Sequence, residues 1–158
     1  MTTSPAAESV TVLTDMYAAE AAYLEAGGPG EASFDLRAPF FAPDVELHQA
    51  DALPYGGTWR GHSGMMRFFR AMAEVWESFD MVEQEFLATG DIAVVRTQVR
   101  ACARRTGREL GFPVLQTITL KHGLITEVRP FYWDTQAITD ACALPSDPTH
   151  PLRAPGSR

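Results

Sequence analysis

Several side chains of this sequence could accept or donate a proton in a reaction, and they lie near the first and the last predicted strands. His48 and Asp51 belong to the segment Val45 to Asp51, which we predict to be a strand. A histidine on a cavity wall can exchange a proton near neutral pH, and a carboxylate there can act as a general base. Structural roles stay open, because a lone strand histidine is more often structural and Asp51 could bind backbone amides of a turn.

The alternation of side chains along this strand decides which residue faces the interior. If Val45 and Leu47 face inward, Asp51 does so too; in the opposite register, His48 faces inward with Glu46. A bulge would admit both. We therefore keep His48 and Asp51 as alternative candidates for the base.

Three long apolar and β-branched runs form the centre of the chain. Two short turn signals separate them, so we predict a meander of antiparallel strands. The strands are expected at Ile92 to Ala103, Leu110 to Leu120 and Ile125 to Trp133. Strands of this length twist, and the sheet should curl around the helices that cover one face. A functional site is expected between that concave face and the helices.

The remaining elements are predicted from helical spacing and from punctuation by glycine and proline. They are a helix from Pro5 to Gly27, a short helix from Ser33 to Pro43, the strand Val45 to Asp51, a helix after Gly61, a strand Phe79 to Leu87, and a last helix from Asp134 to Cys142. Tyr17 shares the apolar stripe of the first helix with Val10, Leu13, Ala21 and Leu24, so it should face inward. The order predicts an α+β domain over residues 1–144, with a curved antiparallel sheet mixed only at an edge and no parallel crossover. The proline-rich segment 145–158 is expected to be a disordered tail.

Composition excludes several classes of function. The 158 residues carry a net charge of −7 and a pI near 5.0, which argues against a nucleic-acid surface. Cys102 and Cys142 lie in no metal-ligand spacing, so neither a zinc site nor a disulfide framework is predicted. No targeting segment or membrane span is recognised, and we expect a cytoplasmic protein without metal or cofactor.

Aromatic and methionine side chains gather in the loop before the third helix and on that helix. Tyr55, Trp59, Met66 and Phe69 are predicted to form pocket wall or core, so a ligand in contact with them should be apolar. Arginines 96, 100 and 104 alternate along one strand and are predicted to lie on a solvated outer face.

The element order resembles the nuclear transport factor 2-like superfamily, and the SnoaL-like branch most of all. The motifs that carry the resemblance are Leu53-Pro54-Tyr55-Gly56-Gly57-Thr58-Trp59-Arg60-Gly61 and Glu127-Val128-Arg129-Pro130-Phe131-Tyr132-Trp133-Asp134. The resemblance implies a cone-shaped α+β barrel that usually dimerises through its outer sheet face. The superfamily includes ketosteroid isomerases, epoxide hydrolases, polyketide cyclases, dehydratases and non-catalytic binding domains, so the motifs specify the fold rather than one reaction.

The ketosteroid isomerases imply roles for particular residues. They place a protonated acid and a tyrosine opposite a carboxylate base, and alignment from Gly107 puts Gln116 at the position of the acid. Its amide can donate a hydrogen bond to an enolate oxygen together with Tyr17, while His48 or Asp51 would move the proton. A core glutamine satisfied by the helices is the structural alternative for Gln116.

The other enzymes of the superfamily fit less well. Epoxide hydrolases need arginine and aspartate two residues apart, and this chain has Arg96 and Gln98 there. Gln98 cannot act as an acid, so we rank epoxide hydrolysis below the other activities. SnoaL-type cyclases use acid–base groups near the late strands, where Tyr132 and Asp134 share a face. Asp134 also directly precedes the last helix, which it could cap.

We therefore expect a cofactor-independent isomerase, cyclase or dehydratase acting on a hydrophobic carbonyl compound such as a polyketide or terpenoid. Its expected substrate-binding residues are Tyr55, Trp59, Met66, Phe69, Gln98, Tyr132 and Asp134. The alternative is a non-catalytic binding domain with the same cavity, and it is favoured if His48, Asp51 and Asp134 all point outward. Phe131 and Trp133, opposite Tyr132, predict a homodimer through the outer sheet face.

Overall fold

The computed structural model describes residues 2–144 and confirms the predicted α+β class. Its helices are α1 (Pro5–Glu25), α2 (Gly61–Val75) and α3 (Thr135–Cys142), with two 3₁₀ turns, η1 (Phe34–Leu36) and η2 (Ala38–Phe40). Its strands are β1 (Phe41–Gln49), β2 (Gly57–Arg60), β3 (Trp76–Thr89), β4 (Ile92–Ala103), β5 (Glu109–Lys121) and β6 (Leu124–Tyr132). The tail expected from residue 145 lies outside the described residues.

All six strands form one sheet in the order β2-β1-β6-β5-β4-β3. The predicted meander is present as β4, β5 and β6, with antiparallel pairing throughout. The expectation of no parallel crossover was wrong, because β1 pairs in parallel with β6. Hydrophobic spacing along β1 and β6 could not show this pairing, since the two strands are brought together only by the intervening helix and meander. The short edge strand β2, which pairs with β1, was also missed.

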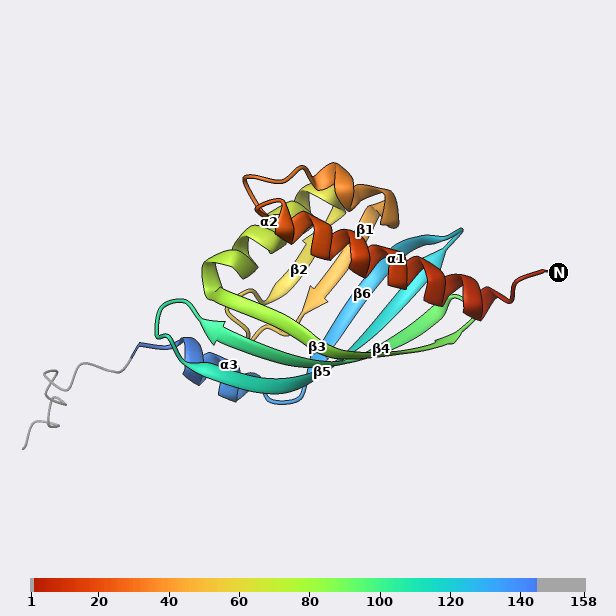
Figure 1. Cartoon of the computed structure of the whole chain (residues 1–158). Coiled ribbons are helices and arrows are strands. Elements are labelled where there is room, and N and C mark those ends of the chain that lie inside the picture. Colours follow the sequence, from red (N-terminus) through yellow and green to blue (C-terminus); the bar gives the residue numbers. More distant parts are fainter. Residues whose placement is uncertain (1, 145–158) are drawn as a thin grey trace, which may run out of the picture.

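The sheet curves, and helices α1 and α2 lie across its concave face (Figure 1). Helix α3 lies beside the turn between β4 and β5, where the Arg108 guanidinium donates to the Asp140 carbonyl. The buried core fills the space between the helices and the sheet and includes Leu13, Val45, Phe68, Val95, Ile118 and Ile125. This arrangement leaves the opposite face of the central strands toward solvent.

Helix α1 begins where its sequence predicts. The Ser4 hydroxyl accepts a hydrogen bond from the Ala7 amide, and Pro5 occupies the first turn. Its buried face differs from the predicted stripe, because Ala21 is exposed and Leu24 is 53% exposed. The buried residues are Ser9, Leu13, Met16 and Tyr23. The helix is turned so that Glu20 and Tyr23 meet partners beneath it, and Tyr17 lies at the edge of the buried face.

The loop between β1 and β2 depends on a glycine. A Cβ at Gly56 would lie 2.6 Å from the Ala50 carbonyl oxygen and 2.8 Å from the Asp51 Cα, which is too close for any side chain. The tight turn buries Tyr55 completely beside α2, where its ring meets Phe68 edge-on. The glycine in the Pro54-Tyr55-Gly56 sequence is thus required for packing at the base of the sheet.

Candidate functional site

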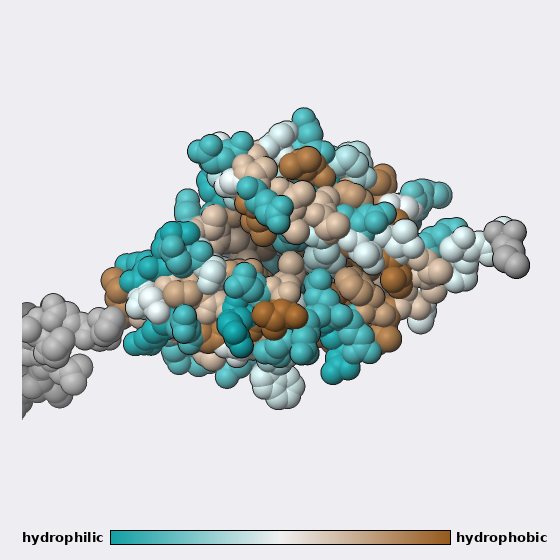
Figure 2. Space-filling model, viewed as in Figure 1, coloured by the Kyte–Doolittle hydropathy of each residue, from teal (hydrophilic) through white to brown (hydrophobic). Residues whose placement is uncertain are grey.

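A cavity of about 510 Å³ lies between the concave face of the sheet and helices α1 and α2. Its wall is largely apolar and includes Met16, Leu47, Phe68, Phe69, Val114 and Ile118. Exposed residues from the end of α1 and the start of β3, among them Leu24, Glu77 and Asp80, border its opening. Figure 2 shows the surface hollowed between these two elements. The volume is in the range that holds a ligand of drug-like size.

Tyr17 and Gln116 meet across this cavity. The Tyr17 hydroxyl, on α1, donates to Gln116 Oε1, on β5, at 3.3 Å. Burial raises the pKa of Tyr17, and the Glu20 carboxylate raises it further, so the phenol stays protonated and remains a donor. The Gln116 NH₂ forms no hydrogen bond with any described residue and is left to donate elsewhere. Because the Tyr17 O–H is donated to Gln116 Oε1, only the Gln116 NH₂ of this pair is free to donate within the described residues. Rotation of the Tyr17 hydroxyl would direct both donors toward one oxygen atom in the apolar cavity.

Buried polar atoms without a protein partner are concentrated on the same wall. Among residues 2–144 these atoms are Arg37 Nε and Nη1, Gln49 Oε1, Trp76 Nε1, Thr97 Oγ1 and His48 Nε2. His48 Nε2 lies 3.2 Å from a Glu46 carboxylate oxygen, which accounts for it. The other four residues all line the cavity. The Trp76 indole also acts as a hydrogen-bond donor toward Tyr55 and opposes the rise that burial causes in its pKa. Arg37, Gln49 and Thr97 are therefore the clearest unpartnered groups among the described residues. Because buried polar groups in folded proteins nearly always have partners, this wall is built to meet polar groups of a ligand or of water.

Gln49, Thr97 and Gln116 form a row of polar side chains, the polar belt, across the inner face of the sheet. Alternation along β1 buries Val45, Leu47 and Gln49 on the inner face. Thr97 on β4 pairs with Val114 on β5, and Gln116 is the next inward-facing residue of β5. The belt therefore consists of neutral hydrogen-bonding groups, with an amide on β1 and another on β5.

A buried ion pair lies beside the belt. The Arg37 side chain, from the turn between η1 and η2, is 3% exposed, and its Nη2 lies 3.0 Å from Glu20 Oε2 on α1. Its guanidinium carbon lies 3.6 Å from the centre of the Phe69 ring. Burial lowers the pKa of Arg37, and the Glu20 carboxylate opposes this shift. Sequence reasoning missed both residues; the polar Glu20 within the buried face of α1 was the available signal.

A pair of tyrosines closes another part of the wall. The Tyr55 hydroxyl donates to the Tyr132 hydroxyl at 3.1 Å, and Tyr132 lines the cavity whereas Tyr55 lies behind it. Burial raises the pKa of Tyr55 to about 12 and that of Tyr132 well above its ordinary value. Both hydroxyls therefore act as neutral donors at physiological pH.

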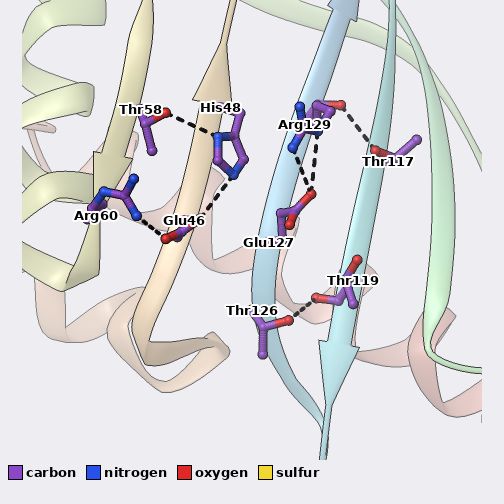
Figure 3. Close-up of polar contacts among 9 residues, drawn as sticks. All are labelled: Glu46, His48, Thr58, Arg60, Thr117, Thr119, Thr126, Glu127 and Arg129. Atoms are coloured by element: carbon purple, nitrogen blue, oxygen red, sulfur yellow. Dashed lines mark hydrogen bonds and ion pairs between the residues drawn. The ribbon is translucent and has the colours of Figure 1, made fainter.

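The structure excludes His48 from the cavity. It lies on the outer face of β1, where Nδ1 is 3.1 Å from the Thr58 hydroxyl and Nε2 approaches Glu46 (Figure 3). Glu127 and Arg129 on β6 face the same side of the sheet. Of the two strand registers left open by the sequence, the one with Val45 and Leu47 inward is correct, so the expected role of His48 as cavity base is wrong.

Asp51 and Asp134 are also outside the cavity. β1 ends at Gln49, and Asp51 is an exposed turn residue, so strand alternation no longer directs its side chain. Asp134 is exposed and caps α3, accepting from the Ala137 amide at 2.9 Å. Capping satisfies this carboxylate, and neither aspartate lines the cavity.

The expected substrate-binding residues divide in a similar way. Phe69 and Tyr132 line the cavity. Trp59 packs against Phe68 and donates its indole N–H to the Tyr55 carbonyl, behind the wall. Met66 is 44% exposed because it lies on the solvent side of α2, and Gln98 is exposed on the outer face of β4. Trp59, Met66 and Gln98 are thus corrected to positions outside the cavity, as are Tyr55 and Asp134.

The described residues offer no other obvious chemical centre. Among residues 2–144, no three His, Cys, Asp or Glu side chains are grouped so as to hold a metal ion. Cys102 and Cys142 are free thiols. No helix within the described range is long and apolar enough to cross a membrane.

Residues 21–128 match the SnoaL-like domain family, and the chain belongs to this family. The matched span includes Arg37, Gln49 and Gln116, whereas Tyr17, Glu20 and Tyr132 flank it. The resemblance recognised in the sequence is thereby confirmed. No curated protein shows significant similarity to this chain.

Solved structures share the fold over nearly their whole length. A nuclear transport factor 2-like protein from Burkholderia xenovorans LB400 is 22% identical, with a TM-score of 0.75 over 87% of this chain and 98% of its own. A candidate SnoaL-like polyketide cyclase from Jannaschia sp. CCS1 is 16% identical, with a TM-score of 0.72 over 92% and 99%. TerC, co-crystallised with polyporic acid, is 20% identical, with a TM-score of 0.72 over 85% and 98%. At these identities the likeness shows the fold alone.

Proposed function

We propose that the cavity binds a hydrophobic small molecule that carries a carbonyl oxygen, and that Tyr17 and Gln116 bind this oxygen. The observation that carries the proposal is the meeting of the Tyr17 hydroxyl and the Gln116 amide on the wall of an apolar cavity, where further buried polar atoms lack partners among the described residues. Polar atoms buried without partners cost about 1–3 kcal/mol each, so a fold that keeps several together gains from a ligand that satisfies them. The TerC structure with polyporic acid is consistent with small-molecule binding in this fold.

Binding can be tested with a matched pair of neutral ligands. 2-Acetylnaphthalene should bind more tightly than 2-ethylnaphthalene, which lacks the oxygen, and isothermal titration measures the difference. Tyr17→Phe should reduce it by about twofold to tenfold, the equivalent of one neutral hydrogen bond. If neither compound binds, or if the ketone has no advantage that depends on Tyr17, the proposal is wrong.

A second candidate function is proton-transfer catalysis, as in an isomerase, cyclase or dehydratase. The outward positions of His48, Asp51 and Asp134 meet the condition that favours binding over catalysis. One observation keeps catalysis in view: the Glu20 carboxylate lines the cavity next to Tyr17. Glu20 would take the α-proton of a ketone while Tyr17 and Gln116 stabilise the enolate oxygen.

Exchange of the α-protons of 2-acetylnaphthalene in D₂O tests this candidate without knowledge of the natural substrate. Mass spectrometry should show faster exchange with the protein than with buffer alone, and Glu20→Gln should abolish the acceleration. Asp80→Asn, which removes an exposed carboxylate at the opening, is the matched control and should leave exchange intact. If the ketone binds tightly but its α-protons exchange no faster than in buffer, the protein binds the ketone without catalysing proton transfer.

The predicted homodimer and the cytoplasmic location stay proposals. Phe131 and Trp133 are 52% and 83% exposed, and Leu115, which pairs with Phe131, is 40% exposed. Covering this patch with a second copy would remove it from water. Light scattering at micromolar concentration should give a dimer mass, and Phe131→Glu should shift it to the monomer mass. A monomer mass for the unaltered chain would contradict the proposal.

A further inference from the structure

Arg37 has donor groups that its ion pair does not use. Glu20 engages Nη2, while Nε and Nη1 are buried and have no partner among the described residues. The guanidinium is otherwise surrounded by aromatic rings: Phe69, Tyr23 and Phe41 have their centres 3.6, 5.6 and 5.9 Å from its central carbon, and among the described residues the Tyr23 hydroxyl accepts no hydrogen bond from Arg37. The cavity that Arg37 lines is therefore where an acceptor can come from.

The charges around Arg37 allow this residue to bind a second anion besides Glu20. Glu20 is the carboxylate that lies within ion-pair distance of Arg37 among residues 2–144. Tyr23 and Tyr17 also act on Arg37, and both stay neutral because burial raises their pKa. The Glu20 side chain is 19% exposed against 3% for Arg37, so the carboxylate is partly hydrated whereas the guanidinium is not. Water therefore partly screens the charge of Glu20, and the buried guanidinium can still attract a second carboxylate. Hydrogen bonds between ionised groups are about twice as strong as neutral ones.

We infer that Arg37 is an anion-binding residue, and that the ligand of this cavity carries an ionised oxygen group, such as a carboxylate, on its hydrophobic body. The inference rests on the proposed binding function and names its ligand class. Nε and Nη1 are buried, so the anion reaches these N–H groups once the side chains around them shift, and the Phe69 ring packs against the guanidinium carbon at 3.6 Å. Glu20 is the resident counter-ion that keeps the charge stable in the interior.

The first test compares two ligands of nearly equal shape. 2-Naphthoate carries an ionised carboxylate where 2-acetylnaphthalene carries a neutral acetyl group. At pH 7.5, titration calorimetry should give at least about tenfold tighter binding of the acid. If the ketone binds and the acid binds equally or more weakly, the inference is wrong and the proposed function stands. If neither binds, both fall together.

Variants separate anion binding from a structural role. Arg37→Gln alone leaves Glu20 without its partner in the interior, so the double variant Arg37→Gln with Glu20→Gln is used. It should lose the preference for 2-naphthoate and keep the ketone affinity within about threefold. Glu20→Gln alone should increase the preference, since it removes the competing carboxylate; a purely structural ion pair predicts no such increase. The inference is overturned if the preference survives in the double variant.

A half-exposed arginine at the opening of the cavity serves as the control. Arg104 is about half exposed, and its Nη1 lies 2.6 Å from Glu77 at the opening. Arg104→Gln should leave the preference for 2-naphthoate unchanged. If the preference for 2-naphthoate is lost in Arg104→Gln but kept in the double variant of Arg37 and Glu20, the anion is attracted at the opening and the inference is overturned.

Discussion

The two faces of the same strands have opposite polar chemistry. On the outer face, charged residues pair with one another in solvent: Arg96 with Glu85 at 3.1 Å and Arg129 with Glu127 at 3.4 Å. On the inner face, polar side chains are few and buried, and several of their atoms lack a partner within residues 2–144. A polar group on the outer face can be replaced by water at little cost, whereas one on the inner face must be satisfied by protein or ligand.

The ion pairs make this difference measurable. The Arg37 and Glu20 side chains are 3% and 19% exposed, while the Arg96 and Glu85 side chains are 65% and 60% exposed. The N–O distances of the two pairs are alike, 3.0 and 3.1 Å, so the pairs differ mainly in burial and in the packing of Arg37 against Phe69. The contrast between the two faces predicts the outcomes of four sets of substitutions and pH changes.

Arg37→Gln should lower the free energy of unfolding by about 3–5 kcal/mol, because it leaves the Glu20 carboxylate unpaired at a largely buried site. Arg96→Gln, the same substitution on the outer face, should cost less than about 1 kcal/mol. Urea denaturation at pH 7 measures both. Equal effects of the two substitutions would show that burial does not distinguish the two pairs.

Gln116→Leu and Gln98→Leu make the same change on opposite faces of neighbouring strands. If the chain catalyses α-proton exchange, Gln116→Leu should lower kcat by about 100-fold to 1000-fold with a smaller change in KM, since its donor matters most as charge develops. Gln98→Leu should leave both constants unchanged. A Gln116→Leu variant with full turnover would make Gln116 a packing residue and remove the main support for enolate stabilisation.

Alkaline pH should destabilise the folded protein because it favours ionisation of tyrosines that are buried on the inner side of the sheet. The folded pKa of Tyr55, raised to about 12 by burial, lies above the ordinary value of 10. The stabilisation is therefore fully present below pH 10 and is lost as pH rises from 10 to 12. For a shift of this size it amounts to about 3 kcal/mol.

Denaturation at pH 8 and pH 11 should show a smaller loss of stability in Tyr55→Phe than in the unaltered chain. Absorbance at 295 nm should find no tyrosine that ionises with the ordinary pKa, because burial also raises the pKa of Tyr17, Tyr23 and Tyr132. Normal ionisation of Tyr55 in the folded protein would contradict the prediction.

Asp134→Ala should have the smallest effect. It removes the hydrogen bond to the Ala137 amide that caps α3, which costs about 1 kcal/mol. Ligand affinity should not change, because Asp134 lies outside the cavity. Asp134→Asn should restore most of the stability, and a loss of ligand binding in either variant would return Asp134 to the list of site residues.

Much of the fold could be predicted because its determinants are local. Periodicity and turn residues located β4, β5 and β6, and the cap at Asp134 and the start of α1 at Pro5 follow from residue type alone. Tyr17 and Gln116 could be paired in advance through the family resemblance, and their hydroxyl and amide lie 3.3 Å apart. The sequence was thus sufficient to predict most of the helices and strands, the family and the pairing of Tyr17 with Gln116. It did not reveal β2, and it predicted a helix where η1, η2 and the start of β1 lie.

The folded structure was needed to show which face of each strand is buried and which groups distant in the sequence are in contact. In β1, one register turns Gln49 inward and His48 outward, and period-two alternation is equally compatible with both. The parallel pairing of β1 with β6 and the contact of Arg37 with Glu20 join segments separated along the chain, where no local preference operates. A buried charge is stable only where its partner is supplied in three dimensions, so the most distinctive residue of this cavity, Arg37, became visible only in the folded chain.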